Sequence, residues 1–410
     1  MKTILVTAYA INPYKGSEDG MGWNFINQIA KSFRVIAITR ENNLPAIEQY
    51  LIEKGESHHA NIEFVGYDLP KHLRFWKRGS FGSLPYFYLW QRTMPAFIKR
   101  KGFQFDLTHN LNFHNDWTPS FLWKLGKPLV WGPIGHHPQI PTTFLKPFGL
   151  KAILKDKLTW AVKKAFWQIS PSLKKTAQKS DLVIAMNQSV KEVLPIESKQ
   201  LRIMPSVGTL WVAQTEQKSQ DAFEVISVGR FVPLKGFDLT IKAFSAFYHA
   251  LPSVERAHVH LRLIGKGPLL DQMKEMVKSL NLEKVVSIVE WVEKAKLESY
   301  YRESNVFLFP SHEGAGMVVA EAMSYGLPVV CLDNCGPGEF LNDESGIAVP
   351  YQAYDKTIQD LAAALQELYE NKEKQQRFSE GARNRFEQYF DWDAKGEELR
   401  KMYTGLLKSA

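Results

Sequence analysis

Short apolar runs alternate with longer amphipathic segments through the first half of the chain. The runs are rich in Val, Ile and Leu, which is typical of buried strands, and the segments between them carry apolar residues at helical spacing. Strands that alternate with helices predict a parallel, doubly wound α/β sheet. The predicted strands are Thr3–Thr7, Arg34–Thr39, Asn61–Val65, Phe105–His109, Pro128–Trp131, Asp181–Ala185 and Leu201–Met204.

The same alternation starts again after Gln214–Asp221, a polar stretch without apolar periodicity that we interpret as a linker. We therefore expect an N-terminal domain over residues 1–213 and a C-terminal domain over 214–389. Helix is expected near the C-terminus with a break around Phe390, and residues 390–410 are expected to pack back on the N-terminal domain. The strands of the second sheet are predicted at Phe223–Val228, His258–Ile264, Val285–Val289, Val306–Phe309, Pro328–Leu332 and Gly346–Val349.

The length of 410 residues suits two domains and excludes a single small module. Ligands of doubly wound sheets bind beyond the carboxyl ends of the strands, so we expect two Rossmann-like domains to face a central cleft. The only cysteines, Cys331 and Cys335, exclude a disulfide framework and suit a reducing compartment. No apolar run approaches the roughly 18 residues that cross a bilayer, and Met1–Ile11 is interpreted as a buried first strand. The expected location is the cytoplasm.

The charge is unevenly distributed along the chain. Residues 1–205 contain 28 Lys and Arg against 14 Asp and Glu, whereas the remainder contains 23 against 29. The excess is concentrated in 71–101 and 146–179, and basic surfaces of this kind favour anionic partners.

The most informative segment is Phe309–Met323, which runs from a predicted strand through a turn of small residues into a helix. The unpaired backbone N–H groups of Gly316, Met317 and Val318 would favour a phosphate or another oxygen-rich ligand. Glu313 in the loop could accept hydrogen bonds from sugar hydroxyls. Glu321 on the helix could reach a ribose, although its spacing fits a solvated helix residue equally well.

Ser227–Asp238 has the same order of strand, turn and helix. Gly229 and Gly236 allow the backbone to approach a ligand, while Arg230 and Lys235 offer two cations to a diphosphate. The alternative is a turn with two exposed cations. The order of residues is not that of a Walker motif.

Arg230 and Lys235, with Glu313 and Glu321 spaced as E-x7-E, resemble the donor site of family four of the retaining glycosyltransferases. This family is also called glycosyl transferases group 1 and has the GT-B fold. The resemblance continues in Leu263–Leu269, Gly326–Val330 and Gly336–Glu339. It implies catalytic roles for His114, Arg230, Lys235 and Glu313, and donor binding by Gly16, Gly229, Gly265, Gly316, Met317, Val318 and Glu321. Secondary or acceptor-binding candidates are His109, Ser17, Glu18 and Glu339.

The N-terminal half agrees with the family more loosely. Gly16-Ser17-Glu18 is similar to the family's glycine-rich loop, and Asp106–Ser120 resembles the segment that contributes an active-site histidine. Measured back from Pro119-Ser120, His114 matches that histidine better than His109.

Four features depart from the common family pattern or compete with it. Ala315 stands where the family usually has an aromatic residue, and Asn334-Cys335-Gly336 replaces its common glycine pair. Trp131–His137 is similar to a variant in some polysaccharide-assembly members, and we derive no role for it from the sequence. Asp391-Trp392-Asp393 spells a metal-binding DxD, but its helical context argues against a metal site.

The resemblance implies a retaining glycosyltransferase that needs no metal or other cofactor. It would move a sugar from a nucleoside-diphosphate sugar (UDP or GDP) to a hydroxyl of a glycan or lipid-linked acceptor, in polysaccharide or glycoconjugate biosynthesis. The alternative within the fold is a nucleotide-sugar epimerase or another non-transferring GT-B enzyme. An NAD-dependent oxidoreductase would need a G-x-G-x-x-G turn that is missing, and a nucleic-acid binder would leave the carboxylates unused, so no nucleic-acid partner is expected.

Two aromatic and basic segments bear on the acceptor. Phe75-Trp76-Lys77-Arg78 and Pro85–Arg92 have a composition suited to an anionic membrane surface, which would place the protein peripherally on the inner face of the cell membrane. The alternative is an amphipathic helix that covers the N-terminal core with a solvated basic rim.

Overall fold

The computed structural model describes residues 1–55, 59–77, 82–111, 115–209 and 222–409. These residues form two compact units, each made of segments that are separated in sequence. The first unit contains residues 1–136, 161–206 and 392–410, and the second contains 137–160 and 207–391. The predicted linker Gln214–Asp221 lies outside the described residues.

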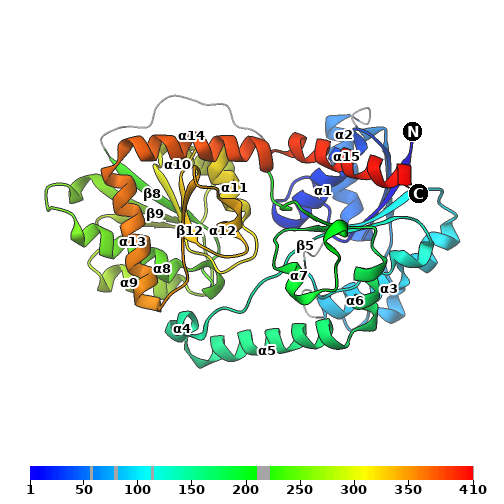
Figure 1. The fold of residues 1–410 in the computed structure, drawn as a ribbon, viewed down its shortest axis with the longest axis horizontal. Helices are drawn as coiled ribbons and strands as arrows, with labels where there is room; N and C mark the ends of the chain where they lie inside the picture. The colour runs from blue at the N-terminus through cyan, green and yellow to red at the C-terminus, as the bar shows by residue number, and fades with distance from the viewer. Residues whose placement is uncertain (56–58, 78–81, 112–114, 210–221, 410) are drawn as a thin grey trace. The chain divides into compact units, whose positions relative to one another are not determined.

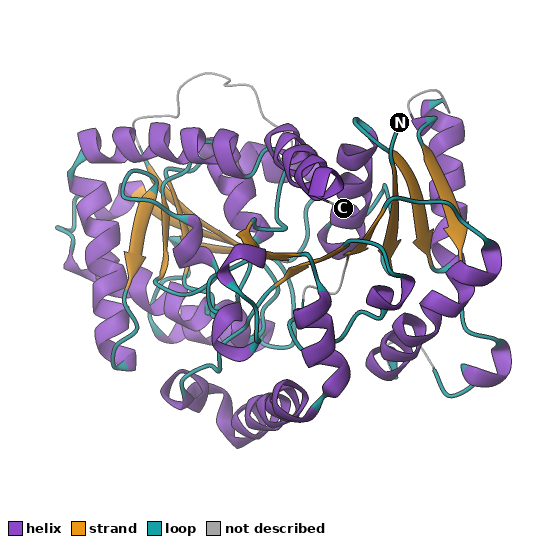
Figure 2. Ribbon diagram, turned by 45° about the vertical axis from the view of Figure 1, so that its right-hand side comes forward, coloured by secondary structure: helices purple, strands orange, loops and turns teal. Residues whose placement is uncertain are grey.

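The first unit is built on a seven-stranded parallel sheet with the order β3-β2-β1-β4-β5-β6-β7. Its chain alternates strand and helix, so the crossovers place helices against both faces (Figures 1 and 2). The strands are β1 Thr3–Ala8, β2 Arg34–Thr39, β3 Ile62–Gly66, β4 Leu107–Leu111, β5 Leu129–Ile134, β6 Leu182–Ala185 and β7 Leu201–Ile203. The helices that belong wholly to this unit are α1 Ser17–Ala30, α2 Leu44–Lys54, α3 Ser83–Lys101, α6 Pro171–Lys179, α7 Val190–Val193 and α15 Trp392–Ser409.

Alternate residues of β1 face two different cores. Ile4 and Val6 belong to a cluster that includes α1 and α15, whereas Leu5 belongs to a cluster with α3. Tyr86, Phe87 and Trp90 of α3 are buried in that second cluster. The burial of these aromatic residues favours the interpretation of this segment as a helix that covers the core, and not as a membrane-binding surface.

The remaining members of the aromatic and basic segments differ among themselves. Phe75 is exposed, whereas the ammonium of Lys77 lies 5.0 Å from the ring centre of Tyr86. Arg78 lies outside the described residues.

The second unit is built on a six-stranded parallel sheet with the order β10-β9-β8-β11-β12-β13. Its strands are β8 Phe223–Val228, β9 Val259–Ile264, β10 Val286–Val289, β11 Val306–Phe309, β12 Val329–Leu332 and β13 Gly346–Val349. Its helices are α4 Thr142–Leu145, α8 Phe237–Ala250, α9 Leu270–Ser279, α10 Lys294–Glu303, α11 Met317–Ser324, α12 Pro337–Phe340, α13 Tyr354–Glu370 and α14 Lys372–Tyr389. Here too, alternate residues of β8 belong to two clusters, one with α8 and α13 and one with α11 and α14.

Residues 137–160, which the sequence analysis placed in the N-terminal domain, are grouped with the second unit. The reason is apolar packing, because Ile140, Phe144 and Leu145 belong to the larger core cluster of that unit. The Phe144 ring contacts the rings of His312, Tyr351 and Tyr354, with centres 5.3–5.5 Å apart. Helix α5, Gly149–Ile169, is divided between the two units.

Helix α15 is part of the first unit although it comes last in the chain. Trp392 meets the Phe25 ring edge-on at 5.2 Å, and Leu399 and Tyr403 are buried in the same cluster. The break before α15 falls where the sequence predicted it, since α14 ends at Tyr389. Across the described residues, we find no helix long and apolar enough to cross a bilayer.

Every predicted strand is present. Most ends agree within two residues, and the largest difference is in β5, which continues past the predicted end at Trp131 to Ile134. The register between β5 and β6 shifts over this extension. Proline and glycine at 132–133 hid the extension, because both residues are unusual inside strands.

Candidate functional site

The strand order of the second unit identifies one edge of its sheet as the place for a ligand. β8 is followed on one side by β9 and β10 and on the other by β11, β12 and β13, so the direction of winding reverses between β8 and β11. Doubly wound sheets bind ligands beyond the carboxyl ends of the strands at this reversal. Both segments singled out from the sequence leave the sheet there, 229–236 after β8 and 310–316 after β11.

Lys235 and Glu313 meet where these two loops meet. The Lys235 Nζ donates a hydrogen bond of 2.7 Å to Oε1 of Glu313, and both side chains are largely buried, with 18% and 13% exposed. The ammonium also lies 5.1 Å from the ring centre of Phe309. An ammonium has three N–H donors and Glu313 uses one, so Lys235 retains donors for a second anionic group.

Burial raises the pKa of Glu313, and the neighbouring Lys235 opposes this increase. A carboxylate in a poorly solvated place is costly unless it is paired. The lysine therefore stabilises the ionised form of Glu313, which is the form that accepts hydrogen bonds from hydroxyl groups.

Two glycines allow the loops to approach each other closely. Gly236 has a φ of +66°, and a Cβ atom there would lie 2.1 Å from the carbonyl oxygen of Pro310. A Cβ atom on Gly336 would lie 2.1 Å from the carbonyl oxygen of Glu313. Any larger residue at either position would displace the loop that carries Glu313.

Helix α11 begins immediately after this loop. No described residue accepts a hydrogen bond from the backbone N–H groups of Gly316, Met317 or Val318, so the first turn offers donors to an anion. Glu321 lies on the same helix and is partly buried, and burial raises its pKa. The Tyr301 hydroxyl lies 3.4 Å from its Oε2. Glu321 is therefore not a solvated helix residue, which was the alternative that its spacing in the sequence allowed.

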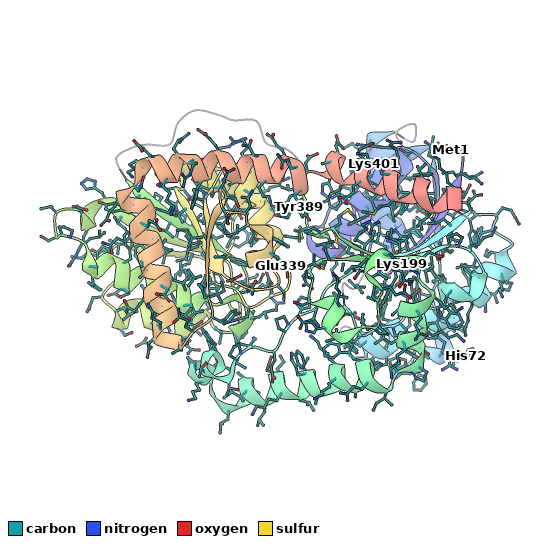
Figure 3. All side chains as sticks on the ribbon, in the orientation of Figure 1. Met1, His72, Lys199, Glu339, Tyr389 and Lys401 are labelled. Carbon is teal, nitrogen blue, oxygen red and sulfur yellow. The ribbon has the colours of Figure 1, made fainter. Side chains whose placement is uncertain are left out.

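The remaining donor-site candidates lie around the same sheet edge. Gly229 and Gly265 directly follow β8 and β9, and Gly265 approaches the Gly229 backbone so closely that a Cβ atom would clash with it. Arg230 is exposed, and among the described residues its side chain has no hydrogen-bond or ion-pair partner. Glu339 is exposed in the first turn of α12, which follows β12 (Figure 3).

The first unit shows the equivalent reversal between β1 and β4. Gly16 precedes α1 and is exposed, and Ser17 begins that helix. Glu18 in its first turn is partly buried, and its pKa is raised, chiefly by this burial and also by the nearby Asp19. His114, the preferred histidine of the sequence analysis, lies outside the described residues.

His109, the other histidine candidate, is fully buried in β4. Its Nε2 lies 2.8 Å from the carbonyl oxygen of Gly132, which can only accept, so Nε2 carries the proton. Its Nδ1 then accepts from the Tyr403 hydroxyl at 2.7 Å. Neither ring nitrogen is left for a substrate, and this arrangement is that of a structural histidine.

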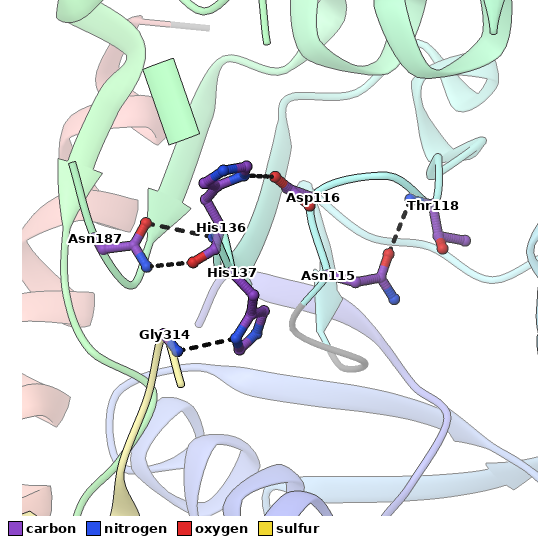
Figure 4. A network of polar contacts seen from close by, with 7 residues as sticks. All are labelled: Asn115, Asp116, Thr118, His136, His137, Asn187 and Gly314. Carbon is purple, nitrogen blue, oxygen red and sulfur yellow. Dashed lines mark hydrogen bonds and ion pairs between the residues drawn. The ribbon is translucent and has the colours of Figure 1, made fainter. Parts of the chain in front are cut away.

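Three further polar residues of the first unit were missed by the sequence analysis. Nδ1 of His136 lies 2.6 Å from Oδ2 of Asp116, and both side chains are buried (Figure 4). The side-chain amide of Asn187 bonds both the backbone N–H and the backbone carbonyl of His136. The segment Trp131–His137, which had no role in the sequence analysis, therefore ends in a network of buried hydrogen bonds.

His137, the next residue, belongs to the second unit. Its Nδ1 accepts a hydrogen bond of 3.0 Å from the backbone N–H of Gly314, directly after Glu313 (Figure 4). The acceptor role requires Nδ1 to be unprotonated. The two adjacent histidines at the end of Trp131–His137 are visible in the sequence, but nothing in the sequence links them to the loop that carries Glu313.

Asn334 is one of the residues that depart from the family pattern. Its Nδ2 donates to the carbonyl oxygen of Ser311 at 2.7 Å, and its Oδ1 accepts from the backbone N–H groups of Gly336 and Gly338. This side chain therefore holds the loop after β12 against the loop after β11. It lies in the segment where the family commonly has a pair of glycines.

Features away from this edge carry less chemistry. Oδ1 of Asp393, in the DxD sequence, accepts hydrogen bonds from Lys31 and Gln28. Among the described residues, no three or more His, Cys, Asp or Glu side chains are placed to hold a metal ion. A pocket of about 430 Å³ in the first unit is lined by both basic and acidic side chains, including Glu398, Lys199 and Lys401. The two lysines are labelled in Figure 3.

Residues 212–385 match the family model described as glycosyl transferases group 1. The chain is similar to D-inositol 3-phosphate glycosyltransferase of Kineococcus radiotolerans, with 33% identity over 201 residues, which are 45% of this chain and 44% of that protein. The match therefore spans less than half of that relative's length.

Two solved structures share the fold over essentially the whole chain. One is Anabaena HepE in complex with UDP and glucose, with a TM-score of 0.62, 17% identity, and coverage of 99% of this chain and 100% of that one. The other is sucrose-phosphate synthase from Thermosynechococcus elongatus, with a TM-score of 0.64, 20% identity and 100% coverage of both chains. The expected fold, GT-B with two Rossmann-like domains, is confirmed, and residues 212–385, less than half of the chain, are similar to the glycosyl transferases group 1 family.

Proposed function

We propose that the protein is a retaining glycosyltransferase that uses a nucleoside-diphosphate sugar. The observation that carries the proposal is the Lys235–Glu313 pair at the edge where the β8 and β11 loops meet. A cation and a carboxylate placed side by side can bind the two halves of such a donor, the diphosphate and the sugar. Anabaena HepE, which shares the fold, has been solved with UDP and glucose.

In the proposed reaction, Lys235 and the exposed Arg230 bind the diphosphate, together with the N–H groups that begin α11. Glu313 binds sugar hydroxyls and Glu321 the ribose. The bond between the anomeric carbon and the diphosphate breaks while the acceptor oxygen bonds to that carbon on the same face. The proton of the acceptor hydroxyl passes to the leaving phosphate oxygen, so the step needs no protein nucleophile and no metal.

The proposed donor carries UDP or GDP, and the proposed acceptor is a glycan or lipid-linked hydroxyl in polysaccharide or glycoconjugate biosynthesis. The alternative, a nucleotide-sugar epimerase, gains no support from the named relatives. The acceptor side is assigned to the first unit, where Gly16, Ser17, Glu18 and His114 follow β1 and β4.

Thermal stabilisation tests the donor class directly. The protein is heated with UDP, GDP, ADP, CMP or NAD⁺, each with a chelator present, and the same is done with Arg230→Ala. A ligand at 100 times its dissociation constant adds about 2.7 kcal/mol of stability, which is a measurable shift in melting temperature. We expect one nucleoside diphosphate to stabilise the wild type and to stabilise Arg230→Ala much less. A response to NAD⁺ alone would contradict the proposal.

His137 is a positioning residue for Glu313 in this scheme. His137→Ala removes the acceptor of the Gly314 N–H, and we expect affinity for the nucleoside-diphosphate sugar to fall about tenfold. Affinity for the nucleoside diphosphate without the sugar should change less than threefold, because Glu313 is assigned to the sugar. Isothermal titration with both ligands measures this difference.

His137→Asn is the matched control, because its amide oxygen can accept in nearly the position of Nδ1. It should bind the nucleotide sugar within about threefold of the wild type. Equal losses of both ligands in His137→Ala, without recovery in His137→Asn, would show a general structural role.

A further inference from the structure

Helix α5 presents an apolar face that the described chain leaves uncovered. Leu150, Leu154, Leu158, Val162 and Ile169 are between 44% and 76% exposed. At 100° per residue these side chains fall within one sector of about 120° on the helix surface. Single exposed apolar residues are common, but an aligned row of them marks an interaction surface.

The opposite face of α5 is the one that packs on the protein. Ile153 contacts the core of the second unit, and Trp167 is buried against the ring of His136 in the first unit. Asp156 and Trp160 are partly buried, and they lie on the same side of the helix as Ile153 and Trp167. The apolar row therefore lies on the side of α5 that does not pack against the rest of the described protein.

Four exposed lysines lie on or beside this sector. At 100° per residue, Lys155 lies about 20° beyond one edge of the sector, Lys157 and Lys164 lie about 20° and 40° beyond the other, and Lys151 lies within it. In the described part of the chain none of the four forms an ion pair with an acidic side chain. Asp156 is the only acidic residue of α5, and its position belongs to the inward face.

We propose that this face of α5 docks on the surface of an anionic lipid bilayer. An amphipathic helix lies in the interface plane with its apolar face in the acyl boundary, while lysines extend to the phosphate groups. The lysines on and beside the sector argue against a second copy of this chain, because packing two such faces together would bring like charges together. The proposal replaces α3 with α5 as the membrane surface and does not depend on the proposed transfer reaction.

Cosedimentation with vesicles tests the proposal without any donor or acceptor. We expect the protein to bind vesicles that contain phosphatidylglycerol, to bind pure phosphatidylcholine much less, and to be released by added salt. Lys157→Gln with Lys164→Gln should weaken binding about fivefold for each lysine. Leu154→Ser with Leu158→Ser should weaken it more than tenfold.

Matched controls replace exposed residues of the second unit outside α5. Val254→Ser with Trp291→Ser removes apolar side chains of similar exposure, and Lys278→Gln removes one exposed charge. Neither should change vesicle binding, and every variant should keep the wild-type melting temperature because the replaced side chains are exposed.

Three outcomes would overturn the proposal. The first is no cosedimentation at low salt, and the second is binding that the serine substitutions in α5 leave unchanged. The third is a dimer in analytical ultracentrifugation that dissociates in Leu154→Ser with Leu158→Ser, which would assign the face to a second copy of the chain.

Discussion

Lys235→Ala is expected to reduce sugar transfer by roughly 10²–10³-fold, the loss typical of removing one preorganised group that stabilises developing charge. Lys235 is placed to hold the leaving diphosphate, and it opposes the rise in the pKa of Glu313. Its removal therefore weakens the leaving group's binding and shifts Glu313 toward the protonated form. The measurement is the rate of nucleoside diphosphate release from sugar donors that carry the nucleotide identified by the stabilisation panel.

The same substitution should lower the free energy of unfolding by about 2–4 kcal/mol, because it leaves Glu313 without its partner in a poorly solvated place. The double variant Lys235→Met with Glu313→Gln removes both charges. It should recover most of the stability, while transfer stays lost. This separates the role of the pair in the reaction from its role in the fold.

Lys278→Ala, at an exposed position on α9, is the matched lysine control and should change neither quantity. Transfer at the wild-type rate in Lys235→Ala would refute the assigned role. Recovery of transfer in the double variant would show that the pair is only structural.

The second large effect is a loss of stability in mild acid that depends on His109 and His312. Both histidines are buried, and burial lowers the pKa of His109 from 6.5 to about 4 and that of His312 to about 3. Below pH 6.5 the unfolded chain binds protons at these positions and the folded chain does not. The stabilisation from each neutral imidazole is thus complete above pH 6.5 and is lost as the pH falls toward the folded-state pKa.

As the pH falls below 6.5, each histidine should lower the free energy of unfolding by about 1.4 kcal/mol per pH unit. Between pH 7 and pH 5 this amounts to about 2 kcal/mol for each histidine. His109 belongs to the first unit and His312 to the second, so each affects the unfolding of its own unit. Denaturant unfolding at several pH values measures the slopes.

His109→Gln and His312→Gln should each reduce the slope by about 1.4 kcal/mol per pH unit, whatever their effect at pH 7. His72→Gln, an exposed histidine of the first unit, is the control and should leave the slope of that unit unchanged (Figure 3). An unchanged slope in His109→Gln would show that this histidine is protonated in the folded protein.

The strands and their order of alternation followed from local patterns. A buried parallel strand needs a continuous apolar run, and every predicted run became a strand within one of the two sheets. Because parallel sheets bind ligands at the carboxyl ends of their strands, polar residues after β8 and β11 could be selected as a site before any geometry was known.

The sequence by itself therefore determined the two doubly wound sheets and the loops that carry Arg230, Lys235 and Glu313. Only the tertiary structure decided which of these side chains meet, that His109 is enclosed by Tyr403 and Gly132, and that residues 137–160 join the second unit. It also decided which face of α5 points outward. The physical reason is that periodicity reports which residues avoid water locally, whereas pairing, enclosure and exposure depend on groups far apart in the chain.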